Sequence, residues 1–369
     1  MYKSYKFRAY PNDKQKQITN QTFGNTRFVY NYYLSKQQQD NNITIKECIS
    51  DYNKLKQTYQ FLSKENQYLM ISTIYKLNNN IKKYKSNGLG YPKYKSKYNK
   101  NSYTLKENII VNLKKQILIS PNLGELKIRG YKKLDKINGT LINITISKEK
   151  NDKYYISLLY DIPTPKRTIP RVTVGIDLGV RKLLTLSDGT AYDNNKYIDK
   201  YEKRIKRKQR ELARKEKGSK NYNKCKKELA ILYSKLSNAR RFYIHKITKN
   251  ITDEYDIITC EKLKTKEMII EGKDNKLSSK INDATFSEII RQLQYKSKYK
   301  GKQFYQINTY YPSSQICSRC DNQDRRYKDL TRREYKCTKC NQELDRDLNA
   351  SINIMFEGLK LYMKNYVRI

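Results

Sequence analysis

The spacing of hydrophobic residues changes along the first half of the chain. A strand is predicted over residues 2–10, before Pro11, and residues from about 13 to 85 are predicted to be helical with one apolar stripe. The stripe consists of Phe23, Phe28, Val29, Tyr32 and Tyr33. Short strands separated by turn residues are then predicted at 109–111, 117–119, 125–128, 141–146 and 154–160. Such a run of short strands indicates a small barrel or sandwich.

Prolines at 163, 165 and 170 mark a linker, after which strands and helices alternate. A strong hairpin turn is predicted at Asp188-Gly189. Residues 196–250 are predicted to be helical and very basic, with a break at Gly218-Ser219. Strands are predicted over 172–178, 183–186, 256–261 and 302–309. The second half of the chain is therefore predicted to be of the α/β class.

Two further helices are predicted towards the end of the chain. Thr285 and Glu288 have the spacing of a capping box, which predicts a helix that begins there and ends near Tyr299. A last helix is predicted from about Leu348, with Asp345 interpreted as its N-cap. Its predicted apolar stripe consists of Leu348, Ile352, Met355 and Leu359.

Acidic residues stand at three places that suggest chemistry. Asp177 interrupts an otherwise apolar strand and shares a face with Gly175 and Gly179, which we interpret as small residues that leave room for metal ions and a phosphate backbone. Glu261 ends the next buried-looking strand, although a glutamate there is often an exposed edge residue. Asp347 lies at the start of the last helix, where backbone N–H groups favour a carboxylate.

Three carboxylates from distant segments can converge on two divalent cations. Carboxylate oxygens are hard ligands that suit Mg²⁺ or Mn²⁺. Such a pair of ions can activate water and stabilise the leaving oxygen of a phosphodiester. The three acids therefore predict a metal-dependent nuclease site.

Four of the seven cysteines lie in two CxxC pairs separated by sixteen residues: Cys317, Cys320, Cys337 and Cys340. This spacing predicts a tetrahedral site for one Zn²⁺ ion, which is closed and therefore structural. The module also carries arginines that could contact nucleic acid: Arg319, Arg325, Arg326, Arg332 and Arg333. The remaining cysteines are predicted to be plain packing or surface residues: Cys48, Cys225 and Cys260.

The charge of the chain indicates a polyanionic partner. There are 78 Lys and Arg residues against 36 Asp and Glu, so the formal net charge is +42. A charge of this size destabilises a compact chain by self-repulsion, which a polyanion relieves. Nucleic acid fits better than a membrane surface, because 35 Tyr residues accompany the cations and can stack on bases. An AT-rich genome would also enrich Lys, but it supplies Asn as well and need not produce such asymmetry.

Several classes of protein are disfavoured. No apolar run approaches the ~18 residues of a membrane span, and the first residues lack the apolar stretch of a secretory signal. Metal-bound thiolates favour a reducing, intracellular setting. The single histidine, His245, excludes nucleases and transposases that need two or three histidines, and it is predicted to be a solvated or satisfied side chain.

Six motifs follow one another along the chain: Tyr5-Lys-Phe-Arg-Ala-Tyr-Pro, Phe23-Gly-Asn-Thr-Arg-Phe-Val-Tyr-Asn, Gly175-Ile-Asp-Leu-Gly-Val, Cys260-Glu-Lys-Leu, Pro312-Ser-Ser-Gln-Ile-Cys-Ser-Arg-Cys and Asp345-Arg-Asp-Leu-Asn-Ala-Ser-Ile-Asn-Ile. As an ordered set they resemble the TnpB family, the RNA-guided nucleases of insertion sequences, which are related to type V CRISPR effectors and to Fanzor proteins. The resemblance covers nearly the whole chain.

The resemblance implies an α/β multidomain fold. An RNase H-like (RuvC) nuclease domain is implied over 171–315 and 342–369, with a Cys₄ zinc ribbon inserted over 316–341. A wedge-like β-barrel domain is implied over 1–12 and 101–168, interrupted by a helical recognition domain over 13–100.

The resemblance also implies the site and the partners. Asp177, Glu261 and Asp347 match the catalytic metal ligands of the family, and Arg333 matches an arginine that borders the active site. The partners implied are a guide RNA and double-stranded target DNA that carries a short adjacent motif, and the protein is implied to bind them as a monomer. The implied location is the cytoplasm, at the nucleoid, or a nucleus or virus if the host is eukaryotic. Asp321 and Asn341 replace glycines common in the family, but both tolerate a left-handed backbone.

Four functions are compatible with these features. The first is an RNA-guided DNA endonuclease, and the second is an RNA-guided DNA-binding repressor that does not cut. The third is a transposase or transposition accessory protein, although RNase H-like transposases present their acids in the order Asp, Asp, Glu rather than Asp, Glu, Asp. The fourth is a structural zinc-ribbon RNA binder, which leaves the three acids unexplained. The presence of all three acids favours the endonuclease.

Overall fold

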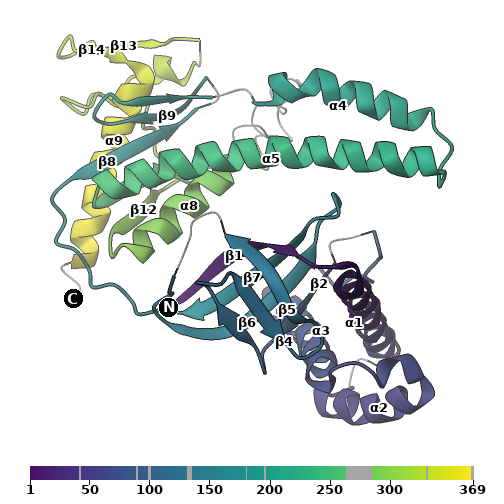
Figure 1. Cartoon of the computed structure of the whole chain (residues 1–369). Coiled ribbons are helices and arrows are strands. Elements are labelled where there is room, and N and C mark those ends of the chain that lie inside the picture. Colours follow the sequence, from purple (N-terminus) through teal and green to yellow (C-terminus); the bar gives the residue numbers. More distant parts are fainter. Residues whose placement is uncertain are drawn as a thin grey trace. The chain divides into compact units, whose positions relative to one another are not determined.

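A computed structural model describes residues 1–40, 43–88, 90–98, 101–130, 135–179, 181–194, 197–262, 285–329 and 331–366. The chain divides into two compact units, Met1–Pro163 and Thr164–Ile369, each with a hydrophobic core of its own. Figure 1 labels their elements. Among the described residues, no helix has the length and apolar character needed to cross a membrane.

The first unit contains an antiparallel sheet of seven strands in the order β2-β6-β7-β1-β5-β4-β3. Each predicted strand is present within about two residues, whereas β2 was not predicted as a separate strand because its residues are largely polar. The strands are β1 (Tyr2–Tyr10), β2 (Asn101–Leu105), β3 (Ile110–Asn112), β4 (Ile117–Ser120), β5 (Gly124–Gly130), β6 (Thr140–Lys148) and β7 (Tyr154–Asp161).

The described residues between β1 and β2 form three α-helices and a short 3-10 helix: α1 (Asp13–Gln39), α2 (Ile45–Thr58), η1 (Gln60–Leu62) and α3 (Gln67–Asn87). Helix α1 begins at Asn12, whose side chain accepts from the backbone of Gln15 in a capping box. The Gln15 amide also donates to the carbonyl oxygens of Leu123 and Glu125 at the start of β5, which ties the helix to the sheet. Of the predicted stripe, Phe23, Val29 and Tyr33 are buried, and Phe28 and Tyr32 are partly buried.

The second unit is built on a five-stranded sheet in the order β10-β9-β8-β11-β12. Strands β8, β11 and β12 are parallel, β9 is antiparallel to β8, and β10 is antiparallel to β9. The predicted turn at Asp188-Gly189 is confirmed, with φ of +90° at Gly189. The strands are β8 (Thr173–Leu178), β9 (Lys182–Leu186), β10 (Ala191–Asp193), β11 (Ile257–Glu261) and β12 (Gln303–Ile307).

Helices α5 (Lys220–Glu254) and α8 (Phe286–Tyr299) cover one face of this sheet and α9 (Arg346–Tyr366) covers the other, while α4 (Tyr197–Ala213) packs on α5. The apolar face of β8, with Val174 and Ile176, packs in one core with residues of α5 and α8. Helix α9 covers the opposite face, where Gly175 allows it to approach β8 (Figure 1). The break predicted between α4 and α5 is confirmed, because Ser219 caps α5.

Two predictions about helices in this unit were wrong. Thr285 precedes α8 but has φ of +49°, and its side chain makes no capping hydrogen bond; Glu288 instead pairs with Arg291. In α9, the residues of the predicted apolar stripe are only partly buried. The fully buried side is mainly small and polar, and consists of Asn349, Ala350, Ser351, Asn353, Ile354 and Gly358. This composition lets the helix lie close to the sheet and bind a neighbouring loop.

The cysteine module lies between β12 and α9. It contains a short 3-10 helix, η2 (Arg325–Lys328), and the two-stranded sheet of β13 (Glu334–Lys336) and β14 (Glu343–Asp345). Tyr327 and Tyr335 are buried against the cysteines, with ring centroids 4.3 Å apart. Strand β14 runs directly into α9, so the module is joined to the start of that helix.

Candidate functional site

Asp177 and Glu261 lie side by side at one edge of the sheet. Strands β8 and β11 are parallel neighbours, and Cys260 is the register partner of Ile176. The next residue on each strand is an acid, so both carboxylates lie at the carboxyl ends of the strands. Asp177 shares the face of Gly175, which contacts α9. The carboxylate of Asp177 therefore lies on the side of the sheet that α9 covers.

Asp347 lies in the first turn of α9 and completes the acidic group. Its own backbone N–H donates to the Asp345 carboxylate at 2.9 Å, and the N–H of Leu348 donates to the same oxygen at 3.3 Å. Asp345 is therefore the N-cap, as predicted, and it also pairs with Lys182 at 3.3 Å. With its capping role taken by Asp345, the Asp347 carboxylate is left available to the site.

The electrostatics of Asp177 show that the three acids act on one another. Burial raises the pKa of Asp177 well above its usual value, and the nearby carboxylates of Glu261 and Asp347 raise it further. Burial also raises the pKa of Glu261, while a hydrogen bond from Ser313 opposes that shift. Glu261 is thus a partly buried residue rather than an exposed edge glutamate. Divalent cations would relieve the repulsion among these carboxylates.

Two arginines lie beside the acids. Arg333, predicted from the resemblance, places Nη1 3.9 Å from Asp347 Oδ1. Arg346 was not singled out from the sequence, yet it is 94% buried at the first position of α9 and lowers the pKa of Asp177 against the larger effects that raise it. Its position directly before Asp347 was a signal that could have identified it.

Gly175 has a different role from the one predicted. A Cβ atom at this position would lie 2.0 Å from the carbonyl oxygen of Ser351 and 2.4 Å from the backbone nitrogen of Met355. The glycine is thus required for the close packing of α9 on β8, and not to leave space for ions. The packing still serves the site, because it sets how far Asp347 lies from Asp177.

The four module cysteines form a compact group. Their four sulfur atoms all lie within 4.8 Å of one another. Both residues that replace the family glycines are left-handed, with φ of +57° at Asp321 and +54° at Asn341, so each CxxC turn closes as expected. The cluster can hold a metal ion, and four thiolates suit zinc.

The remaining cysteines, the arginines of the module and the single histidine lie in different surroundings. Cys48, Cys225 and Cys260 are buried, as packing residues. All five arginines of the module are exposed, but Arg326 is already paired with Asp324 at 2.6 Å. His245 is partly buried, and burial lowers its pKa. Neither observation gives the histidine a part in the acidic site.

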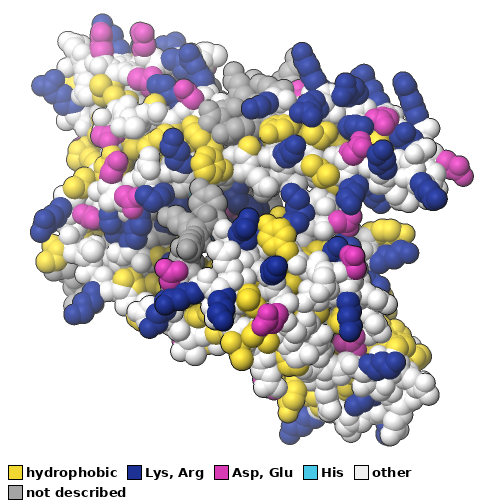
Figure 2. Space-filling model, viewed as in Figure 1, with side chains coloured by type: hydrophobic (Ala, Val, Ile, Leu, Met, Phe, Trp, Pro, Cys, Tyr) yellow, Lys and Arg dark blue, Asp and Glu magenta, His cyan; other side chains and the backbone are white. Residues whose placement is uncertain are grey.

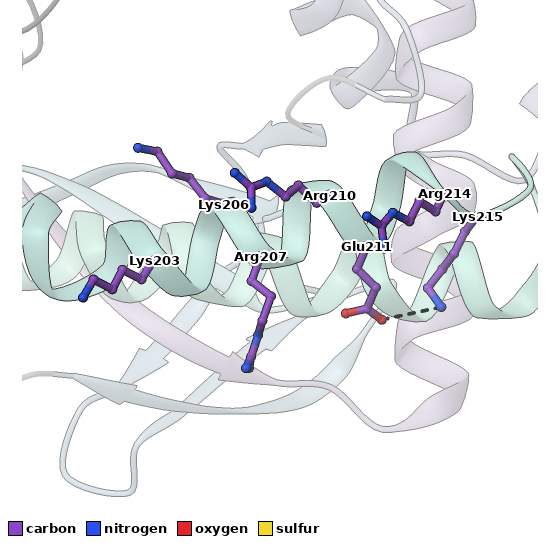
Figure 3. Close-up of a pocket in the computed structure, with 7 residues that line it drawn as sticks. All are labelled: Lys203, Lys206, Arg207, Arg210, Glu211, Arg214 and Lys215. Atoms are coloured by element: carbon purple, nitrogen blue, oxygen red, sulfur yellow. Dashed lines mark ion pairs between the residues drawn. The ribbon is translucent and has the colours of Figure 1, made fainter.

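A strongly basic surface lies along α4. Its inner side packs on α5 through Ile205, and Lys208 bridges to Glu228 of α5 at 2.6 Å. The outer residues line a pocket and are mainly cations, drawn in Figure 3: Lys203, Lys206, Arg207, Arg210, Glu211, Arg214 and Lys215. Among described residues no acid pairs with Arg207 or Arg210. Figure 2 shows Lys and Arg spread over the viewed face as well.

Comparisons with known proteins cover almost the whole chain. Residues 156–271 match the family described as "Probable transposase", residues 286–354 match the "Cas12f1-like, TNB domain", and residues 1–41 match a "Helix-turn-helix domain". Within residues 1–41, however, the described structure is a strand followed by one long helix.

Two curated relatives align along nearly their full length. A "Putative RNA-guided DNA endonuclease" of Streptomyces pristinaespiralis is 27% identical over 97% of this chain and 89% of its own. InsQ of Escherichia coli, named in the same way, is 26% identical over 96% and 92%. The "TnpB-like protein L79" of Acanthamoeba polyphaga mimivirus is 25% identical over 64% of this chain and 47% of its own. The chain is therefore similar to TnpB-type proteins along nearly its whole length.

Two solved structures are similar to this chain in overall fold. The protein in the "Cas12f1-sgRNA-target DNA complex" aligns with a TM-score of 0.60 at 15% identity, covering 96% of this chain and 98% of that one. The "mini-RNA-guided endonuclease CRISPR-Cas_phi3" aligns with a TM-score of 0.51 at 9% identity, covering 97% and 92%. The chain thus has an α/β multidomain fold similar to that of these proteins.

Proposed function

We propose that this protein is a TnpB-family RNA-guided DNA endonuclease that hydrolyses phosphodiester bonds at one acidic site. The observation that carries the proposal is the grouping of Asp177, Glu261 and Asp347, from β8, β11 and α9, at one end of the second unit's sheet. The relatives aligned over nearly their whole length bear the same function in their names. The net charge of +42 supports binding of both nucleic acids.

In this proposal the second unit is an RNase H-like (RuvC) domain over 171–315 and 342–369, with a zinc ribbon over 316–341. The order β10-β9-β8-β11-β12, with β9 the single strand antiparallel to the others among the described residues, supports it. The first unit is a wedge-like barrel over 1–12 and 101–168, interrupted by a helical recognition domain over 13–100. Its sheet and its three inserted helices support that division.

The acids would hold Mg²⁺ or Mn²⁺, which supplies an activated water and stabilises the leaving oxygen. The donor set fits such ions, because it consists of hard oxygen atoms whose mutual repulsion raises the pKa of Asp177. Arg333, exposed and 3.9 Å from Asp347, would bind the phosphate of the strand being cut. Zn²⁺ would be held by the four module cysteines and would keep the start of α9 in place.

The partners in this proposal are a guide RNA and target DNA, bound by a single copy of the chain. The cationic outer side of α4 is suited to a phosphate backbone, because Arg207 and Arg210 are not neutralised by described acids (Figure 3). Base pairing of the guide would select the target, and the protein would contact the shape of the duplex.

Co-purification tests the function. The protein is expressed with its native flanking DNA, bound RNA is sequenced, and a matching DNA duplex is offered with Mg²⁺. Guide-dependent cuts are expected from the wild type and from Asp193→Ala, which changes an exposed acid of β10. Asp177→Ala should retain RNA but not cut. A specific RNA without cuts would establish the guided repressor instead, and absence of a specific RNA would favour a transposition accessory protein.

A further inference from the structure

The loop that joins β12 to the cysteine module contacts the acidic site through a side chain with no assigned role. The Ser313 hydroxyl donates to Oε1 of Glu261, and Ser313 is 94% buried. Glu261 is the last residue of β11. One hydrogen bond to Oε1 selects a rotamer and leaves Oε2 for other ligands. We refer to residues 312–316 as the serine loop.

The same loop also contacts the start of α9. Ser314 Oγ accepts from Nη2 of Arg346 at 3.3 Å, and Nη1 of Arg346 donates to the carbonyl oxygen of Asp329 at 3.1 Å. Arg346 directly precedes Asp347. Two adjacent serines thus contact the elements that carry two different acids of the site.

Two buried asparagines of α9 hold the serine loop in place. Asn353 donates to the carbonyl oxygens of Ser313 and Ile316 at 2.8 and 2.6 Å, and Asn349 donates to Ile316 at 2.7 Å. Both are at least 98% buried. Buried amides are costly unless their hydrogen bonds are made, so these contacts explain why polar residues occupy the covered side of the helix.

From these contacts we propose that Ser313 is a positioning residue for Glu261, held in register by Asn353. The hydroxyl fixes the glutamate in the orientation in which it can share a divalent cation with Asp177. The effect of Ser313 on cleavage rests on the proposed function. Its effect on metal binding does not, because metal binding can be measured on the chain without DNA. Residues that orient a metal ligand typically contribute a factor of about 10 to 100 in metal affinity or activity.

The test compares four variants of the full chain with its bound RNA. Ser313→Ala removes the hydroxyl, Ser313→Thr retains it, and Asn353→Asp replaces the amide donor with a carboxylate facing two carbonyl oxygens. Ser297→Ala is the matched control, because this serine is fully buried in α8 and its hydroxyl has no partner among the described residues. Mn²⁺ binding is measured by electron paramagnetic resonance without DNA. Cleavage is then measured against Mg²⁺ concentration.

Ser313→Ala should bind Mn²⁺ about 10- to 100-fold more weakly and need correspondingly more Mg²⁺ for half-maximal cleavage, with RNA affinity and unfolding midpoint close to those of the wild type. Ser313→Thr should recover most of the loss, and Ser297→Ala should show none. If Ser313→Ala does not fold, Asn353→Asp decides by the same Mn²⁺ measurement. Wild-type Mn²⁺ affinity in Ser313→Ala, or in a folded Asn353→Asp, would overturn the proposal.

The two proposals can fail separately. A wild type that binds Mn²⁺ through Asp177 but cuts no DNA would refute the endonuclease while leaving the Mn²⁺ comparison of Ser313→Ala decisive. A wild type whose Mn²⁺ affinity is unchanged by Asp177→Ala would refute the positioning role, because the acids would then not share an ion.

Discussion

Substitution of Gly175 by alanine tests why this strand carries a glycine beside an acid. The added Cβ would lie 2.0 Å from the Ser351 carbonyl oxygen and 2.4 Å from the Met355 nitrogen. Real Cβ atoms essentially never come closer than 3.0 Å to such atoms, so β8 and α9 would have to separate by about 1 Å. Both obstacles are backbone atoms of a helix, which cannot be moved by a change of rotamer.

The expected cost follows from this geometry. Overpacking of a rigid site typically costs about 1–3 kcal/mol, and we expect the upper part of that range in the free energy of unfolding. Because the displacement separates Asp347 from Asp177, a shift of about 1 Å should also lower the cleavage rate by about 100-fold. Stability and activity should therefore fall together.

The assay combines denaturant unfolding with guide-dependent cleavage. Gly24→Ala is the matched control, because it lies inside α1 and its Cβ would meet only Arg27 Nη2, at 3.9 Å. That change should stabilise the chain by about 0.5–1 kcal/mol without lowering cleavage. A Gly175→Ala variant that loses cleavage at full stability would mean that the glycine makes room for ions or DNA. A variant unchanged in both would refute the packing argument.

Three further predictions concern the acids, the zinc and the basic helix. Asp177→Asn should stabilise the metal-free protein at high pH. The pKa of Asp177 is raised in the folded protein, so the stability that its protonated form provides is lost as pH rises through that pKa. Unfolding midpoints measured from pH 5 to 9 should show that the variant is more stable than the wild type at high pH, but not at low pH or with saturating Mg²⁺. Cys337→Ser should lower the zinc content and destabilise the module, and unchanged zinc stoichiometry by mass spectrometry would contradict the Cys₄ site. Arg207→Gln with Arg210→Gln should weaken RNA binding and reduce its salt dependence by about one to two counterions, whereas an unchanged slope of affinity against salt would remove α4 from the interface.

The sequence alone indicated most elements of this fold and the chemistry of the site. Alternation and helical spacing are local properties, so β1, β8 and the break before α5 could be predicted from neighbouring residues. An acid on an apolar strand and two CxxC pairs are also local signals. They identified Asp177 and the cysteine group without knowledge of what lies opposite them.

The tertiary structure decided which residues meet. The sequence gives no sign that Ser313 contacts Glu261, since 52 residues separate them, or that Arg346 is buried rather than exposed. Gly175 and the polar side of α9 were misinterpreted for the same reason: the helix that packs there follows more than 170 residues later. The sequence around a residue indicates what chemistry its side chain can perform. Only the folded chain brings the atoms on which it acts within reach, because contacts in space are set by packing between distant segments.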